Sequence, residues 1–137
     1  MDKIVLSGFA DEISSSLDRQ IQVLKKLGIS HMEIRGVEKK GIDTYTTEEV
    51  KEIKGKLDDQ GIAISSLASP IGKINIKDDF TPHLGHFKHV AELAHVLNTR
   101  YIRMFSFFMP EGKDPDGNTE TVFEQLDQLI RVGKEQD

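Results

Sequence analysis

Tyr101-Ile-Arg-Met-Phe-Ser-Phe-Phe108 is the stretch of sequence that decides the fold. It is too short and too rich in β-branched and aromatic residues for a helix, so it predicts a buried strand. Apolar residues fall on both of its faces, which is typical of a parallel strand covered on each side. Arg103 stands out, because a charged side chain is costly to bury without a partner. The predicted strand is therefore also the first place to look for chemistry.

Three further strands are predicted upstream, and a helix with an apolar stripe follows each of the four strands. The upstream strands are residues 4–6, 31–36 and 62–67. The helices are predicted to start near Ser15, Thr46, Thr81 and Thr121, and the first three to end at left-handed caps on Gly28, Gly61 and Asn98. Repeated strand–helix units of this kind are joined by right-handed crossovers and build a parallel sheet.

The chain is therefore predicted to have an α/β fold of four consecutive β-α units with parallel strands. Two architectures fit this pattern, an open doubly wound sheet and the N-terminal half of a (β/α)8 TIM barrel. A whole barrel needs about 250 residues. With 137 residues, the chain has the length of half a barrel.

Composition limits the classes of partner. Hydrophobic residues make up 37% of the chain and charged residues 30%, which indicates an ordinary soluble globular protein. The net charge of −5 gives no support for a nucleic-acid partner. The chain has no cysteine, which suits the cytoplasm, and its N-terminal apolar run is too short for a signal peptide. No segment approaches the roughly 20 apolar residues of a membrane span. We therefore expect a cytoplasmic protein that binds neither nucleic acid nor membrane.

The carboxyl ends of the strands are where a β/α fold binds its ligand. Glu33 and Arg103 lie within their strands, and two interpretations stay open. They form either the polar floor of a pocket, where Arg103 binds a carboxylate, phosphate or sugar hydroxyl, or an ion pair that closes the middle of the sheet. Arg35, nearer its strand end, is either a substrate contact or a solvated residue of the rim.

The loop Ser65-Ser-Leu-Ala-Ser-Pro-Ile-Gly-Lys73 is small, polar and ends in a lysine. Such a loop can approach a sugar closely and offer hydroxyl groups and an ammonium group. It lacks the spacing of a P-loop, and a plain turn is the alternative interpretation.

Two metal-like patterns do not predict a metal site. His83, His86 and His89 follow one another at helical spacing, but His86 and His89 turn away from the apolar stripe and are expected to be exposed. His83 stays near the stripe, where it can face the rim of the strand ends. Residues 114–118 begin like a calcium loop, yet Thr119 and Gln125 occupy the positions that need glycine and glutamate. We interpret that segment as a turn before a helix.

Four motifs in register resemble the sugar phosphate isomerase/epimerase family, which has the xylose isomerase-like TIM barrel fold. They are Ser7-Gly-Phe-Ala-Asp-Glu-Ile13, Met32-Glu-Ile-Arg-Gly-Val37, Ala68-Ser-Pro-Ile-Gly-Lys73 and residues 101–108. The resemblance runs the length of the chain and implies that residues 1–137 are a single partial barrel domain. It also implies an isomerase or epimerase that moves a proton next to the carbonyl of a sugar or sugar phosphate, and that depends on a divalent metal (Mn, Mg, Zn or Co).

Family members are about twice as long, and their metal ligands and acid/base carboxylates come mainly from later strands. No metal ligand and no catalytic residue therefore carries over, and we expect this chain alone to be an inactive N-terminal half without metal. The substrate-side positions do carry over: Phe9, Glu33, Arg35, Ser69, Lys73, Arg103 and Ser106.

Two other functions remain open on sequence grounds. A half-barrel exposes the edges of its first and fourth strands, so the chain is alternatively a binding or structural module that pairs with itself or with another chain. The third interpretation, an open-sheet ligand-binding domain of flavodoxin-like type, is disfavoured by the missing Gly-rich phosphate loop.

Overall fold

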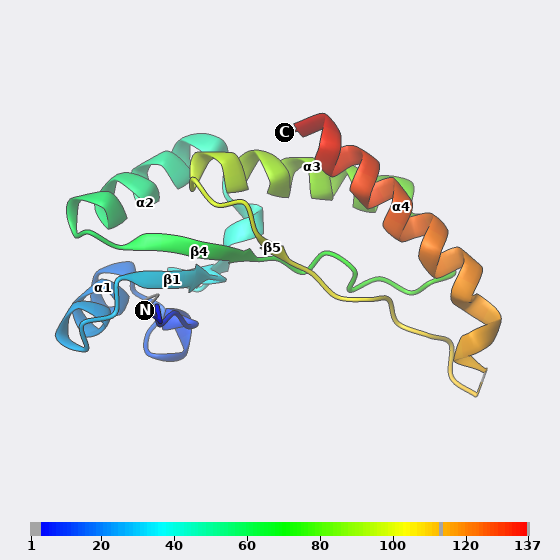
Figure 1. The fold of residues 1–137 in the computed structure, drawn as a ribbon, viewed down its shortest axis with the longest axis horizontal. Coiled ribbons are helices and arrows are strands. Elements are labelled where there is room, and N and C mark those ends of the chain that lie inside the picture. The colour runs from blue at the N-terminus through cyan, green and yellow to red at the C-terminus, as the bar shows by residue number, and fades with distance from the viewer. Residues whose placement is uncertain (1–3, 113, 137) are drawn as a thin grey trace. The chain divides into compact units, whose positions relative to one another are not determined.

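A computed structural model describes residues 4–112 and 114–136 of the chain (Figure 1). The chain divides into two compact units, one made of Met1–Ser69 with Leu93–Arg103 and the other of Pro70–Glu92 with Met104–Asp137. Within the described residues, no helix is long and apolar enough to cross a membrane.

The first unit contains a parallel three-stranded sheet in the order β1-β4-β5. Its strands are β1 (His31–Ile34), β4 (Ala63–Ala68) and β5 (Ile102–Arg103). In the central strand, Leu67 pairs with Ile34 on one side and with Ile102 on the other. Parallel strands connected through helices confirm the predicted α/β class.

The helices are α1 (Leu17–Lys26), α2 (Thr47–Asp59), α3 (Thr81–Val96) and α4 (Thr119–Gln136). The ends of the first three helices and the start of α2 follow the predicted capping signals, whereas α1 begins at Leu17 without a side-chain cap from Ser16 and α4 begins at Thr119. Thr46 and Glu49 form a complete capping box at the start of α2. Gly28, Gly61 and Asn98 have φ angles of 69°, 70° and 56°, so the three left-handed caps are confirmed.

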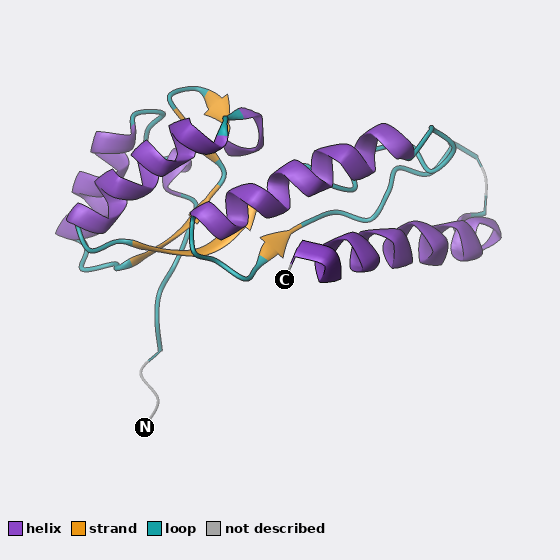
Figure 2. Cartoon of the chain, turned by 90° about the horizontal axis from the view of Figure 1, so that it is seen from above, coloured by secondary structure: helices purple, strands orange, loops and turns teal. Residues whose placement is uncertain are grey.

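The predicted strand at residues 4–6 is wrong. These residues belong to no strand, and the Ile4 side chain is 91% exposed. A strand needs a ladder of backbone hydrogen bonds, whereas this segment is tied to β1 by the Glu33 N–H donating to the Gly8 carbonyl (3.0 Å). Residues 4–6 accordingly run away from the sheet (Figure 2).

The strand predicted at residues 101–108 is shorter than expected. Only Ile102–Arg103 forms β5, and Phe108 makes an isolated bridge with Asn75 in the second unit. Phe107 is buried as predicted, but Tyr101 and Phe108 are exposed. From residue 104 onward the chain pairs with the loop after β4, so it leaves the sheet.

A small hairpin, which the sequence did not predict, follows β1. Its strands are β2 (Gly36–Val37) and β3 (Lys40–Gly41), joined by Glu38 and Lys39 with φ angles of 48° and 65°. The Glu38 carboxylate accepts a hydrogen bond from the Leu17 N–H (3.0 Å), while the N-cap Ser16 makes no side-chain bond. Glu38 thus caps α1 from 21 residues away.

Lys39→Gly is expected to stabilise the first unit. A left-handed lysine costs roughly 1–2 kcal/mol, part of which the greater chain entropy of glycine offsets, so we expect a gain of about 0.5–1 kcal/mol. The free energy of unfolding in urea measures this gain. The control is Lys51→Gly inside α2, which is expected to lose about 1 kcal/mol. Equal losses in the two variants would contradict the strain at Lys39.

Candidate functional site

Phe9 lies between two arginines at the carboxyl ends of the parallel strands. The guanidinium carbon of Arg35 is 4.7 Å from the centre of the Phe9 ring, and that of Arg103 is 5.7 Å away. A cation over an aromatic face is attracted by the charge distribution of the ring. We refer to these three residues, together with the residues that hold the arginines, as the Phe9 cluster. The residues that hold the arginines are Asp11, Glu12, Glu33 and Ser69.

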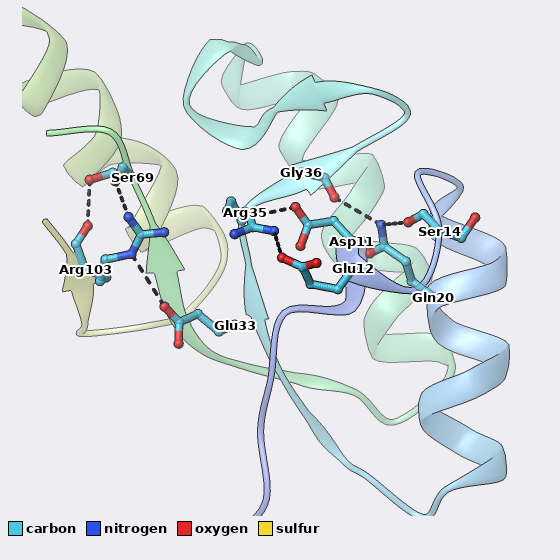
Figure 3. Close-up of polar contacts among 9 residues, drawn as sticks. All are labelled: Asp11, Glu12, Ser14, Gln20, Glu33, Arg35, Gly36, Ser69 and Arg103. Atoms are coloured by element: carbon cyan, nitrogen blue, oxygen red, sulfur yellow. Dashed lines mark hydrogen bonds and ion pairs between the residues drawn. The ribbon is translucent and has the colours of Figure 1, made fainter. Parts of the chain in front are cut away.

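Arg103 is held on two sides (Figure 3). Its Nε lies 3.9 Å from a Glu33 carboxylate oxygen, and its terminal nitrogen donates to the Ser69 carbonyl (3.1 Å). The Ser69 hydroxyl in turn donates to the Arg103 carbonyl (2.8 Å), which ties β4 to β5. The ion pair with Glu33 is therefore present. The two side chains are 29% and 25% exposed, so a ligand can also reach them.

Arg35 is anchored by two carboxylates that precede α1. Its Nε donates to Asp11 (2.8 Å) and its terminal nitrogen to Glu12 (2.6 Å), and these bonds raise the pKa of Arg35 further above its usual value. Gly36 leaves room for this arrangement, since a Cβ there would lie 3.0 Å from an Asp11 carboxylate oxygen. The sequence did not reveal that Asp11 and Glu12 pair with Arg35.

The backbone around Arg35 is braced from α1. Gln20 is 1% exposed, and its amide donates to the carbonyls of Gly36 (3.1 Å) and Ser14 (2.8 Å) (Figure 3). A buried amide that satisfies two carbonyls fixes the local geometry, because breaking either bond would leave a buried polar group unpaired. Gln20 therefore supports the site from behind, and its helical position alone did not signal this role.

A cavity of about 310 Å³ lies beside Arg35 and can hold a small polar molecule. Its lining comes from the residues before α1, the end of β1 and the hairpin: Asp11, Ser15, Arg35, Gly36, Lys39, Lys40 and Gly41. A larger hollow of about 830 Å³ lies between α1 and α2, lined by helix residues such as Arg19 and Lys56. Because ligands of β/α folds bind at strand ends, we assign the site to the smaller cavity.

Two of the seven sequence-predicted site residues lie in the second unit. The Lys73 ammonium lies 4.5 Å from the centre of the Phe105 ring, and Ser106 is exposed in the following position. The structure brings together the other five, Phe9, Glu33, Arg35, Ser69 and Arg103, within the Phe9 cluster.

His83 does lie against the loop after β4. Its Nε2 accepts a hydrogen bond from the Gly72 N–H (2.8 Å), and burial, reinforced by His86, lowers the pKa of His83. The prediction that His86 and His89 are exposed is wrong. Both are half-buried, and the His86 ring packs edge-on against that of His83.

The described residues do not fit the divalent metal that the family resemblance implies. Among residues 4–112 and 114–136, no three His, Asp or Glu side chains come together to hold a metal ion. The calcium-like segment is a turn, as predicted, with the Asp114 carboxylate accepting from the Asp116 N–H (3.1 Å) before η3 (Pro115–Asn118). We therefore derive no step through a metal from this chain.

Comparison with known proteins places the chain in a family. A family model described as xylose isomerase-like TIM barrel matches residues 21–137. A search of curated proteins found no match.

Solved structures resemble the fold at low sequence identity. The probable 3-DHS dehydratase AsbF of Bacillus anthracis is 15% identical with a TM-score of 0.74, and the alignment covers 97% of this chain and 49% of that protein. A sugar phosphate isomerase/epimerase from Parabacteroides distasonis is 16% identical (TM-score 0.69; 99% and 49% covered). D-psicose 3-epimerase from Clostridium cellulolyticum is 15% identical (TM-score 0.69; 95% and 49% covered).

The chain thus spans about half the length of these barrels, which confirms the predicted half-barrel fold. Together with the family model over residues 21–137, this fold means that the chain belongs to the xylose isomerase-like TIM barrel family.

Proposed function

We propose that this chain is the substrate-binding half of an isomerase or epimerase that moves a proton next to the carbonyl of a sugar or sugar phosphate. The Phe9 cluster is the observation that carries the proposal. An aromatic face can stack on the C–H face of a sugar, while guanidinium and carboxylate groups bond to its hydroxyls. The cavity beside Arg35 shares Asp11 and Arg35 with the cluster and has room for part of such a ligand.

The charge of the cluster favours a neutral sugar. Arg35 and Arg103 face three carboxylates, those of Asp11, Glu12 and Glu33. The cluster itself has no surplus positive charge, so a phosphate group within it would gain little Coulomb attraction, whereas the cavity beside Arg35 is also lined by Lys39 and Lys40. The cluster is therefore suited to hydroxyl groups. Lys73, which belongs to the second unit, is proposed as a substrate contact from the sequence alone.

The proposal includes a divalent metal, Mn, Mg, Zn or Co, in the full-length enzyme. This part rests on the family alone, so the residues of this chain are assigned only the binding and orientation of substrate. We propose that the 137-residue chain is inactive by itself and that the protein is cytoplasmic, which the absence of cysteine supports.

Arg103→Ala is expected to weaken sugar binding about tenfold while leaving the fold intact. The variant removes a charged hydrogen-bond donor, and such bonds contribute about 1.5–3 kcal/mol. NMR titration of the ¹⁵N-labelled chain with D-fructose and with D-fructose 6-phosphate measures the affinities. Arg131→Ala is the control, because Arg131 is an exposed arginine paired with Asp127 on α4. If neither sugar shifts the resonances of Phe9, Arg35 and Arg103, the proposed binding role is wrong.

A proton-exchange experiment on the same chain tests the proposal that it has no isomerase or epimerase activity by itself. In D2O with Mn2+ and either sugar, we expect no exchange of the proton on the carbon next to the carbonyl. Exchange that follows the chain through purification, and disappears in Arg103→Ala, would contradict that proposal and show that this half carries its own proton-transfer group.

A second candidate function is pairing with another copy or chain. β1 and β5 are the outer strands of the three-stranded sheet, and residues 4–6 expose Ile4, Val5 and Leu6. Exposed apolar segments and open strand edges pair readily. Light scattering across a wide range of protein concentration tests this function. A dimer that forms as concentration rises supports pairing with a second copy, and a monomer throughout excludes it.

A further inference from the structure

The loop after β4 meets the chain after β5 in an unusually close backbone contact. Gly72 has a φ angle of 87°, and a Cβ built on it would lie 1.8 Å from the Phe105 carbonyl oxygen. Just before it, the Ile71 carbonyl accepts a hydrogen bond from the Phe105 N–H (2.7 Å). Just after it, Lys73 places its ammonium over the Phe105 ring. The position of Lys73 therefore depends on how Gly72 is held.

His83 holds Gly72 from the first turn of α3. The hydrogen bond from the Gly72 N–H to His83 Nε2 is 2.8 Å long. A ring nitrogen that accepts a hydrogen bond cannot carry a proton, so the proton of the neutral ring lies on Nδ1. The ring of Phe80 lies 5.4 Å away between centroids and packs beside it.

We propose that His83 is a positioning residue, whose neutral imidazole anchors Gly72 and thereby fixes the loop that carries Lys73. The anchoring of the loop stands on the geometry alone. The consequence for ligand binding rests on the proposed function, in which Lys73 contacts the substrate. The sequence left His83 as a direct contact at the rim, whereas its ring nitrogen is already used by the backbone.

Protonation of the ring would break this anchor. An imidazolium carries N–H groups on both nitrogens, so Nε2 would then face the Gly72 N–H donor to donor. Besides His83, the charged or titratable groups of α3 are His86, Lys88, His89, Glu92 and His95, of which His86 packs against the His83 ring. The loop carries Lys73, Lys77, Asp78 and Asp79, and residues 104–108 carry none. Burial and His86 both lower the pKa of His83, which keeps the ring neutral at neutral pH.

Two substitutions separate the hydrogen bond from the bulk of the ring. The amide oxygen of glutamine reaches about as far from the backbone as Nε2 and accepts a hydrogen bond without titrating, so His83→Gln is expected to keep the anchor. The amide oxygen of asparagine corresponds to the nearer Nδ1, so His83→Asn is expected to lose it. His86→Gln is the matched control, with the same substitution one turn further along α3.

NMR of the whole 137-residue chain, without any sugar, tests the proposal. At about pH 7.5 we expect the His83 ring to be the Nδ1–H tautomer, with a titration midpoint below the usual value of about 6.5. In the unmodified chain, the protection factor of the Gly72 amide against hydrogen exchange is expected to fall about tenfold when the pH is lowered and the His83 ring becomes protonated. In His83→Asn it is expected to be about tenfold lower both at about pH 7.5 and at low pH. His83→Gln and His86→Gln are expected to keep the protection at about pH 7.5, and His83→Gln to keep it at low pH as well.

An Nε2–H tautomer of His83 would overturn the proposal. An equal loss of Gly72 protection in His83→Gln and His83→Asn would also overturn it, because the loss would then come from the packing of the ring and not from its hydrogen bond. If His83→Asn does not fold, the tautomer and the pH titration of the unmodified chain still decide. These measurements are made without a ligand, so they are independent of the sugar titration. If the Gly72 protection depends on His83 as expected but no sugar binds, the proposed function is wrong and the anchoring role of His83 stands.

Discussion

Gly72→Ala is expected to be one of the most damaging single substitutions in the chain. The new Cβ would overlap the Phe105 carbonyl oxygen, and alanine at a φ angle of 87° would add backbone strain. Because the obstacle is backbone, it cannot move aside as a flexible side chain would. We expect a loss of about 3–5 kcal/mol from the free energy of unfolding, measured by urea denaturation.

Gly61→Ala is the matched control for this prediction. Gly61 also has a positive φ angle, 70°, but nothing lies within 4 Å of the Cβ it would gain. It therefore reports the backbone strain alone, about 1–2 kcal/mol. If the two variants lose the same amount, the close approach of Gly72 to Phe105 does not exist in solution.

Leu67→Ala is expected to lose about 2–5 kcal/mol of unfolding free energy. Leu67 is fully buried in the central strand, between β1 and β5, where truncation leaves a cavity that the sheet cannot close. Urea denaturation followed by circular dichroism measures the loss. A value under 1 kcal/mol would show that β4 is not the centre of the core.

Leu6→Ala is the control for Leu67→Ala and tests whether residues 4–6 lie outside the sheet. Leu6 is 66% exposed, so its truncation is expected to change stability by less than about 0.5 kcal/mol. A barrel strand at residues 4–6 would instead bury this side chain. A loss comparable to that of Leu67→Ala would restore the strand predicted from the sequence.

The repeated strand–helix units could be predicted because their signals are local. Glycine or asparagine in the left-handed conformation ends the first three helices, and the capping box at Thr46 begins the second. Residues 4–6 have the same local apolar pattern as the other predicted strands. A strand also needs a neighbouring strand whose backbone N–H and C=O groups are available for pairing, and the local sequence does not report this. The short β5 has a similar cause, because the loop at residues 70–76 pairs with the chain that would have extended it.

The sequence predicted which residues form the candidate site better than it predicted the contacts among them. Arg35 was selected because it lies near its strand end, and Arg103 because it is a charged residue within a predicted strand. The structure brings both to the Phe9 ring. The sequence did not reveal that Asp11 and Glu12 hold Arg35, because the partners lie 24 and 23 residues apart. His83 was selected for its place on the helix, yet its role depends on a backbone N–H that has no sequence signal.

The cap that Glu38 provides to α1 also bears on the order in which the chain folds. A helix that is capped by its own neighbours can complete its first turn as soon as it forms. Here the capping carboxylate is 21 residues away, so closing that loop must come before the first turn of α1 is satisfied. Cutting the chain between α1 and the hairpin would therefore leave a fraying helix start, although every residue of the helix itself would be present.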